Sequence, residues 1–234
     1  MTKLVLLHGL NTSPRVWART TAAMPDVGDI VVPILPAQRD VDAIARTLLA
    51  DLPDRFSVAG FSLGGYVALA MHALEPDRLD GVALVNSSPV ADDERTRSLR
   101  RKTIARAAAG DYEKLTLEQP RLVFHPENLG DAALQQAFAA MIPEVGAECF
   151  IAHMQACLAR PDRRASLADT STPFLVATAR EDRVIPPAVQ RTTLAAVDHA
   201  VYRELEGAGH MLPMERPDAL AEVLHGWLNE SRHG

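Results

Sequence analysis

Short apolar runs alternate with helical patterns along most of this chain, and the alternation constrains the fold more than any other feature. Six runs have the length and composition of strands: residues 4–7, 30–35, 56–59, 81–85, 173–178 and 200–205. Between them, apolar side chains recur at helical spacing, as at Val41, Ile44 and Leu48 after the candidate N-cap Asp40. Strands separated by helices pair in parallel through right-handed crossovers. The sequence therefore predicts an α/β fold with a mostly parallel sheet of about six strands flanked by helices.

Residues 89–172 break this alternation, because they contain helical patterns and no convincing strand. We predict that they form a helical cap inserted into a core made of residues 1–88 and 173–234. The pattern at 145–158 places apolar side chains on more than one face of a helix. That helix is expected either to be an ordinary core helix or to pack on the sheet while also lining a pocket.

The composition and charge are those of an ordinary globular protein. Of 234 residues, 47% are apolar and 23% are charged, and the formal net charge is −6. The negative charge argues against a general nucleic-acid surface, and no apolar stretch of about 18 residues is present to span a membrane. The first apolar run is too short for a signal peptide, and Cys149 and Cys157 alone make no disulfide framework. We expect a cytoplasmic protein with two buried structural thiols and no nucleic-acid or membrane partner.

The strongest chemical signal is a strand-to-helix turn with the sequence Gly60-Phe61-Ser62-Leu63-Gly64-Gly65. A serine at such a turn has a cramped backbone that glycine neighbours permit, and its hydroxyl is presented above the strand ends as a nucleophile. The Leu63 N–H lies at the helix N-terminus, where it can stabilise an oxyanion. The loop after the first strand supplies a second candidate donor, the Leu10 N–H beside Gly9.

A serine hydroxyl needs a base, and His210 is the candidate because it follows the last strand. His8 is expected to pack and to orient its own loop instead. The imidazole in turn needs a carboxylate that fixes its tautomer and stabilises its cation. Asp182 and Glu181 both follow the 173–178 strand, and either is placed to supply that carboxylate.

Other chemistries have weaker signals. His153 and Cys157 lack the further ligands that a metal site needs, and no phosphate-binding glycine motif follows a strand, so we expect no metal and no cofactor. Six cations and no acid fall within residues 95–106: Arg95, Arg97, Arg100, Arg101, Lys102 and Arg106. This basic stretch is expected either to be a solvated helix face or to dock an anionic partner such as an acyl carrier protein.

Taken together, these residues resemble the α/β-hydrolase superfamily. The resemblance covers the His8-Gly9 loop with Trp17, the turn at Ser62, Arg160-Pro161-Asp162, Asp182, and the stretch from Gly209-His210 to Pro217. The order Ser62, Asp182, His210 is the one expected for this superfamily, and the resemblance favours Asp182 over Glu181. The chain looks closest to small carboxylesterases with a helical lid, including the type that cleaves the methyl ester of pimeloyl-carrier protein.

Two departures from the family pattern affect what is expected. Such families often carry Asp-x-x-Gly-x-Gly after the second strand, whereas this chain has Leu35-Pro36-Ala37-Gln38-Arg39-Asp40. The chain also begins at the strand before His8, without the two N-terminal strands common in the superfamily. The resemblance therefore implies six parallel strands in the order 4-3-5-6-7-8 of the family numbering. Pro33 and Pro36 interrupt the second strand, which predicts an edge position.

The residues and the resemblance together predict a serine hydrolase that cleaves a carboxylic ester through an acyl-enzyme, with Ser62, His210 and Asp182 as its catalytic triad. A carbon–carbon bond hydrolase and a non-catalytic small-molecule receptor of the same fold are the alternatives. The serine nucleophile disfavours dehalogenase and epoxide hydrolase chemistry, which the resemblance links to an aspartate. The substrate pocket is expected to be apolar and lined by Trp17, Phe138, Phe150, Met154 and Met211.

Overall fold

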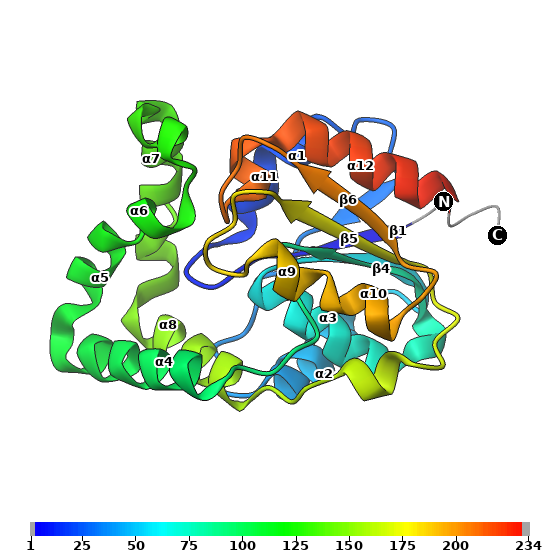
Figure 1. The fold of residues 1–234 in the computed structure, drawn as a ribbon, viewed down its shortest axis with the longest axis horizontal. Coiled ribbons are helices and arrows are strands. Elements are labelled where there is room, and N and C mark those ends of the chain that lie inside the picture. Colours follow the sequence, from blue (N-terminus) through cyan, green and yellow to red (C-terminus); the bar gives the residue numbers. More distant parts are fainter. Residues whose placement is uncertain (1–2, 231–234) are drawn as a thin grey trace.

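The structure, a computed structural model, describes residues 3–230 as one six-stranded sheet with helices on both faces and at one end (Figure 1). The strands are β1 (Lys3–Leu7), β2 (Asp29–Val31), β3 (Phe56–Phe61), β4 (Leu79–Val85), β5 (Phe174–Ala179) and β6 (Val201–Leu205). Their order is β2-β1-β3-β4-β5-β6, and every neighbouring pair is parallel. The predicted sheet and strand order are therefore confirmed, including the edge position of the proline-interrupted second strand.

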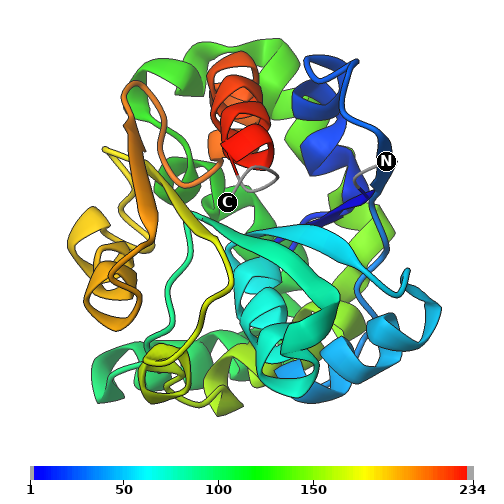
Figure 2. The same cartoon turned by 90° about the vertical axis from the view of Figure 1, so that its right-hand side faces the viewer.

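Side chains that alternate along the strands fill two hydrophobic cores, one on each face of the sheet. Leu4 and Leu6 belong to the first core, and Val5 and Leu7 belong to the second, as the two-residue period of a strand requires. Figures 1 and 2 show the helices that cover the two faces. They are α1 (Ala18–Ala22) and α12 (Pro217–Glu230) on the first face, and α2 (Val41–Asp51) and α3 (Leu63–Leu74) on the second.

Between β4 and β5, the described chain forms helices and no strand. The cap helices, as we call them, are α4 (Glu94–Arg106), α5 (Tyr112–Glu118), α6 (Pro120–Val123), α7 (Ala132–Ala139) and α8 (Ile142–Ala159). In Figure 1 they are green and stand at the end of the sheet to which the strand arrows point. They therefore face the carboxyl ends of the strands, the edge at which open α/β sheets bind ligands.

Short helical turns complete the connections between these elements. They are η1 (Pro14–Trp17), η2 (Pro76–Arg78), η3 (Ala107–Asp111), η4 (Pro126–Gly130), η5 (Arg164–Leu167), α9 (Pro187–Gln190), α10 (Thr192–Ala196) and α11 (Leu212–Glu215). The α2 helix begins as predicted, because the Asp40 side chain accepts a hydrogen bond from the Ala43 amide at 2.8 Å.

Helix α8 joins the cap helices to the core. Near its C-terminus, Ala156 and Cys157 pack in the core shared with α2 and α3. One to two turns earlier, Phe150 and Met154 pack with Tyr112 in a separate small cluster among the cap helices. The helix therefore packs on the sheet domain with one part of its surface and on the cap with another.

Within residues 3–230, no single helix has both the length and the apolar content needed to cross a membrane. The bent pair α7 and α8 reaches that threshold only when the two helices are counted together.

Candidate active site

Ser62 sits at a sharp turn between β3 and α3, with φ 52° and ψ −112°. A positive φ at a residue with a side chain costs about 1–3 kcal/mol and persists only where the surroundings enforce it. Here the Ser62 amide donates to the Val85 carbonyl of β4 at 3.0 Å. A Cβ on Gly60 would collide with the Gly64 carbonyl, and one on Gly64 would collide with the Leu7 carbonyl. The flanking glycines therefore allow the turn that exposes the serine at the strand ends.

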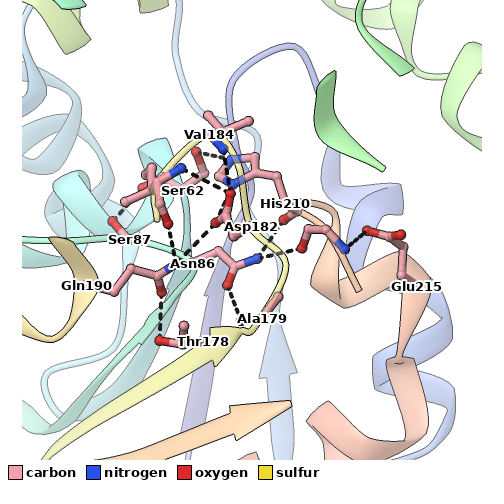
Figure 3. Close-up of polar contacts among 12 residues, drawn as sticks. Ser62, Asn86, Ser87, Thr178, Ala179, Asp182, Val184, Gln190, His210 and Glu215 are labelled. Carbon is pink, nitrogen blue, oxygen red and sulfur yellow. Dashed lines mark hydrogen bonds and ion pairs between the residues drawn. The ribbon is translucent and has the colours of Figure 1, made fainter. Parts of the chain in front are cut away.

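Three side chains from different loops form a continuous chain of hydrogen bonds (Figure 3). Ser62 Oγ donates to His210 Nε2 at 2.9 Å, and His210 Nδ1 donates to Asp182 Oδ2 at 2.9 Å. His210 follows β6 and Asp182 follows β5, so the parallel sheet brings both to the edge where Ser62 lies. All three residues are buried. The geometry is the one in which an imidazole can take a proton from a serine hydroxyl.

The Asp182 carboxylate is held by its own loop as well as by His210. Oδ1 accepts from the Val184 and Ile185 amides at 2.8 and 3.0 Å, and Oδ2 also accepts from Gln190 Nε2 at 3.1 Å. Glu181, the rival acid in the sequence, accepts instead from the Gly207 amide at 3.0 Å. The structure thus brings Asp182, and not Glu181, to the imidazole.

Asn86 is a site residue that the sequence reasoning missed. It directly follows β4, is fully buried and has a positive φ of 45°. Its Nδ2 donates to the carbonyls of Gly209 and His210 at 3.1 and 2.8 Å, and its Oδ1 accepts from the Ala179 amide at 2.7 Å. Asn86 therefore ties the His210 loop to the end of β5, just before Asp182. Its place directly after a buried strand was the signal available in the sequence.

Glu215 is a second residue that the sequence reasoning missed. One carboxylate oxygen accepts from the Gly209 amide at 2.8 Å, and the other accepts from the His125 amide and Asn128 Nδ2, both at 2.7 Å. Burial raises the pKa of this carboxyl. A Cβ on Gly209 would lie 2.7 Å from the His125 nitrogen, so the loop before His210 lies directly against the cap backbone. Glu215 thus fastens the His210 loop to the segment between α6 and α7.

Replacing Glu215 with glutamine should destabilise the protein by about 1–3 kcal/mol. The new NH₂ group cannot accept a hydrogen bond, so it leaves at least one of the three N–H donors described above without its acceptor. At about 2–4 °C per kcal/mol for a chain of this size, the melting temperature should fall by several degrees. Thermal unfolding measures the effect, and Glu222→Gln on the exposed side of α12 is the matched control. Equal melting temperatures for the Glu215 variant and the unaltered protein would contradict this role.

Of the two expected oxyanion donors, Leu63 directly follows Ser62 and Leu10 shares its cavity. Leu63 is the first residue of α3, and the first amides of a helix have no intrahelical acceptor. Leu10 lines the same cavity as Ser62. The backbone reaches this position because a Cβ on Gly9 would lie only 2.7 Å from the Phe61 ring. Their role as oxyanion donors stays a prediction.

His8 orients the loop that carries Leu10. Its Nε2 accepts from the Leu35 amide at 3.0 Å, and its Nδ1 donates to the Gly9 carbonyl at 3.0 Å. Burial lowers the pKa of His8 to about 4, and the Gly9 hydrogen bond opposes this shift. The ring is therefore neutral at pH 7 and fixes the loop instead of acting as a base.

A cavity of about 810 Å³ lies at Ser62 and His210, between the core and the cap helices. Four of the five expected pocket residues line it: Phe138, Phe150, Met154 and Met211. Trp17 does not belong to the lining, so its predicted place is wrong. It ends the short helix η1 and is fully buried in the core on the α1 and α12 face, where its large apolar ring packs out of reach of the cavity.

The cap histidine His153 connects α8 to residues 35–40, the loop in which the sequence departs from the family pattern. Its Nε2 donates to the Pro36 carbonyl at 3.0 Å, and burial lowers its pKa. Cys149 Sγ lies 3.7 Å from the ring and is only partly buried, so the expectation of two buried thiols holds for Cys157 alone. Across residues 3–230, no three His, Cys, Asp or Glu side chains gather as a metal site would require.

The basic stretch forms helix α4, and acids outside the stretch pair with most of its cations. The ion pairs are Arg97 and Arg101 with Glu94, Arg100 with Asp92, and Arg106 with Asp111 and Glu118. In the part of the chain that the structure describes, Arg95 and Lys102 have no such partner. Arg100 also points inward: its side chain is only 17% exposed and lines the cavity. The charge on the outer face of α4 is therefore smaller than the sequence suggests.

Comparison with known proteins identifies the family of this chain. Residues 4–223 match the Alpha/beta hydrolase family. A pimeloyl-[acyl-carrier protein] methyl ester esterase of Aromatoleum aromaticum is 25% identical over 245 residues, which cover 94% of this chain and 96% of that protein. A putative carbamate hydrolase, RutD, of Azorhizobium caulinodans is 26% identical over 190 residues, or 80% of this chain and 71% of that protein.

Solved structures share the fold at lower sequence identity. A thermophilic esterase from Thermogutta terrifontis, with malate bound, superposes with a TM-score of 0.90 at 22% identity, covering 99% of this chain and 90% of that one. The similarity in fold, the family match over almost the whole chain and the hydrolase relatives all agree. The chain therefore belongs to the alpha/beta hydrolase family.

Proposed function

We propose that the protein is a serine hydrolase that cleaves a carboxylic ester through a covalent acyl-enzyme. One observation carries the proposal: an unbroken line of hydrogen bonds runs from Ser62 Oγ through His210 to Asp182 at the wall of a cavity. The similarity to a methyl ester esterase supports an ester as the substrate.

In the first half of the reaction, Ser62 Oγ attacks the ester carbonyl carbon while His210 Nε2 takes the hydroxyl proton. The carbonyl oxygen becomes an oxyanion that accepts hydrogen bonds from the Leu63 and Leu10 amides. Asp182 keeps the proton of the neutral imidazole on Nδ1 and stabilises the imidazolium that forms. The ester C–O bond then breaks, and His210 gives its proton to the departing alcohol.

In the second half, water attacks the acyl carbon while His210 Nε2 takes one of its protons. The tetrahedral intermediate expels Ser62 Oγ, which recovers a proton from His210, and the carboxylic acid leaves. One ester and one water yield one acid and one alcohol, and the enzyme returns to its starting protonation state.

A fluorophosphonate probe tests this proposal, because it reacts with an activated serine and not with a passive one. We expect labelling of the full chain at Ser62, identified by peptide mapping, together with hydrolysis of short p-nitrophenyl esters. A small-molecule receptor would give neither result. A carbon–carbon bond hydrolase would be labelled but would cleave a diketone faster than any ester or carbamate in a substrate panel.

An anionic carrier protein at α4 stays a prediction for this esterase. Charge reversal at two exposed cations of α4 that do not line the cavity, by Arg101→Glu with Lys102→Glu, should lower kcat/KM for a carrier-linked ester by about tenfold or more at low salt. Hydrolysis of a small methyl ester by the same variant is the internal comparison. Equal losses for the two substrates would refute docking at this face.

A further inference from the structure

We propose that the active-site cavity contains a carboxylate-binding subsite built around Arg100, and that the preferred ester carries a free carboxylate away from its scissile carbonyl. This inference deepens the proposed function, since it names the substrate class of the same cavity. It starts from a buried cluster of charges that the catalytic steps do not use.

One carboxylate at the edge of the cavity is shared by two guanidinium groups. Asp92 Oδ2 accepts from Arg100 Nε at 2.6 Å, and Asp92 Oδ1 pairs with Arg160 Nη2 at 2.8 Å. The side chains of Asp92 and Arg160 are only 3% and 7% exposed. Two positive charges against one negative charge leave the cluster with one surplus positive charge, largely shielded from water.

Arg160 is a fixed member of this cluster and has little to offer a ligand. Its Nη1 donates to the Cys157 carbonyl at 2.8 Å and its Nη2 to the Val90 carbonyl at 3.0 Å. Its guanidinium carbon lies 4.0 Å from the centre of the Tyr66 ring, and its Nε is buried without a partner. Backbone carbonyls, the ring and Asp92 therefore hold Arg160 in place.

Arg100, in contrast, has unused hydrogen-bonding capacity. After its Nε bond to Asp92, its Nη1 meets only the Met154 sulfur, at 3.6 Å. A thioether is a weak acceptor, and within residues 3–230 its Nη2 has no acceptor at all. Arg100 lines the cavity together with Ser62. The unused N–H groups of this cation are therefore available to an occupant of the cavity.

The cluster lies close to the nucleophile. Tyr66, which stacks against Arg160, is on α3 four residues after Ser62, about 6 Å along a helix axis. Burial raises the pKa of Tyr66, and Arg160 and Arg100 oppose that shift. The phenol thus lies within the field of both cations. Because Ser62 and Arg100 line the same cavity, one ligand can contact both.

A carboxylate fits this subsite better than other groups do. It carries the single negative charge that the cluster lacks, and its two oxygens match the planar N–H groups of a guanidinium. A neutral ester leaves the surplus charge unpaired, which is costly in a desolvated site. The wider lining agrees, because it contains five arginines and three acidic residues in a chain whose net charge is −6.

Two methyl esters that differ only at the far end test the subsite. Monomethyl glutarate carries a carboxylate where methyl glutaramate carries a neutral amide of the same shape. We expect kcat/KM for monomethyl glutarate to be higher by about tenfold or more, the usual effect of a hydrogen bond to a charged group. Arg100→Gln should remove most of this preference, mainly through KM.

Arg55→Gln is the matched control, because Arg55 pairs with Asp80 at the opposite end of the sheet. It should leave the preference unchanged. Arg100→Lys keeps the charge but loses the planar group, so it should retain an intermediate preference. Thermal unfolding of each variant shows whether it is folded before its kinetics are compared.

Calorimetric binding of glutarate and of neutral glutaramide to the full chain tests the carboxylate subsite separately from the proposed esterase activity. Glutarate binding that Arg100→Gln abolishes supports the subsite even if neither methyl ester is hydrolysed, in which case the proposed esterase activity fails alone. Hydrolysis of both esters with equal kcat/KM, and a ratio that Arg100→Gln does not alter, overturns the subsite and leaves the esterase activity intact.

Discussion

Replacing Ser62 with alanine should lower kcat for ester hydrolysis by about 10⁶, to the residual rate that the oxyanion donors and substrate binding alone can sustain. The reason is that no other hydroxyl is hydrogen-bonded to His210 Nε2 among the described residues. His210→Ala should cost about as much, since the two groups act as a unit. Steady-state hydrolysis of a p-nitrophenyl ester measures both losses.

The control for this experiment is Ser166→Ala, because Ser166 is exposed and its hydroxyl bonds only the Arg163 carbonyl. That variant should keep full activity. If Ser62→Ala kept near-full hydrolysis after purification from any contaminating esterase, the acyl-enzyme mechanism would be wrong.

Asp182→Asn should lower kcat by about 10⁴, although it changes only one oxygen to an NH₂ group. The Val184 and Ile185 amides bond one carboxylate oxygen, so they select the amide oxygen of the new side chain. Its NH₂ group then faces His210 Nδ1 and forces the imidazole proton onto Nε2. In that tautomer, His210 cannot accept the proton of Ser62.

Glu181→Gln is the neighbouring control, since Glu181 bonds the Gly207 amide and not the imidazole. It should change kcat by less than about tenfold, within the range of a peripheral hydrogen bond. A large loss in Glu181→Gln with a small loss in Asp182→Asn would transfer the supporting role to Glu181.

The parts of the site that local patterns dictate could be predicted from the sequence. The glycines around Ser62 indicate a tight strand-to-helix turn. The alternation of strands and helices then predicts that the loops of Asp182 and His210 lie at the same edge of the sheet. The position of a strand in the chain thus determined where its loop lies. This is why the sequence could place Ser62, Asp182 and His210 at one edge of the sheet, where their hydrogen bonds join them.

Contacts between distant segments could not be predicted in the same way. Asn86 bonds backbone carbonyls 123 and 124 residues away, and Glu215 bonds an amide 90 residues away. Backbone groups carry no side-chain identity, so the sequence holds no sign of such partners. The position predicted for Trp17 was wrong for a related reason. The sequence of a short helical turn does not show on which side its large ring packs.

The basic stretch shows how charge counted along a sequence differs from charge on a surface. Arg100 and Arg101 are neighbours, yet successive helix positions point about 100° apart. Arg100 turns inward to Asp92, and Arg101 stays outside with Glu94. Both acids precede residues 95–106, in which every charged side chain is a cation. A helix face, and not a sequence window, is therefore the unit in which such charge should be assessed.

The contacts of Glu215 have a consequence for the alignment of the base. The Gly209 amide and the His125 amide share this carboxylate, and the Met211 amide also donates to the Val123 carbonyl, at 3.2 Å. A displacement of the cap at residues 123–128 must break these bonds, and the same bonds restrain the loop of the base. The position of residues 123–128 and the alignment of the imidazole are thus mechanically coupled, so a change in one is transmitted to the other.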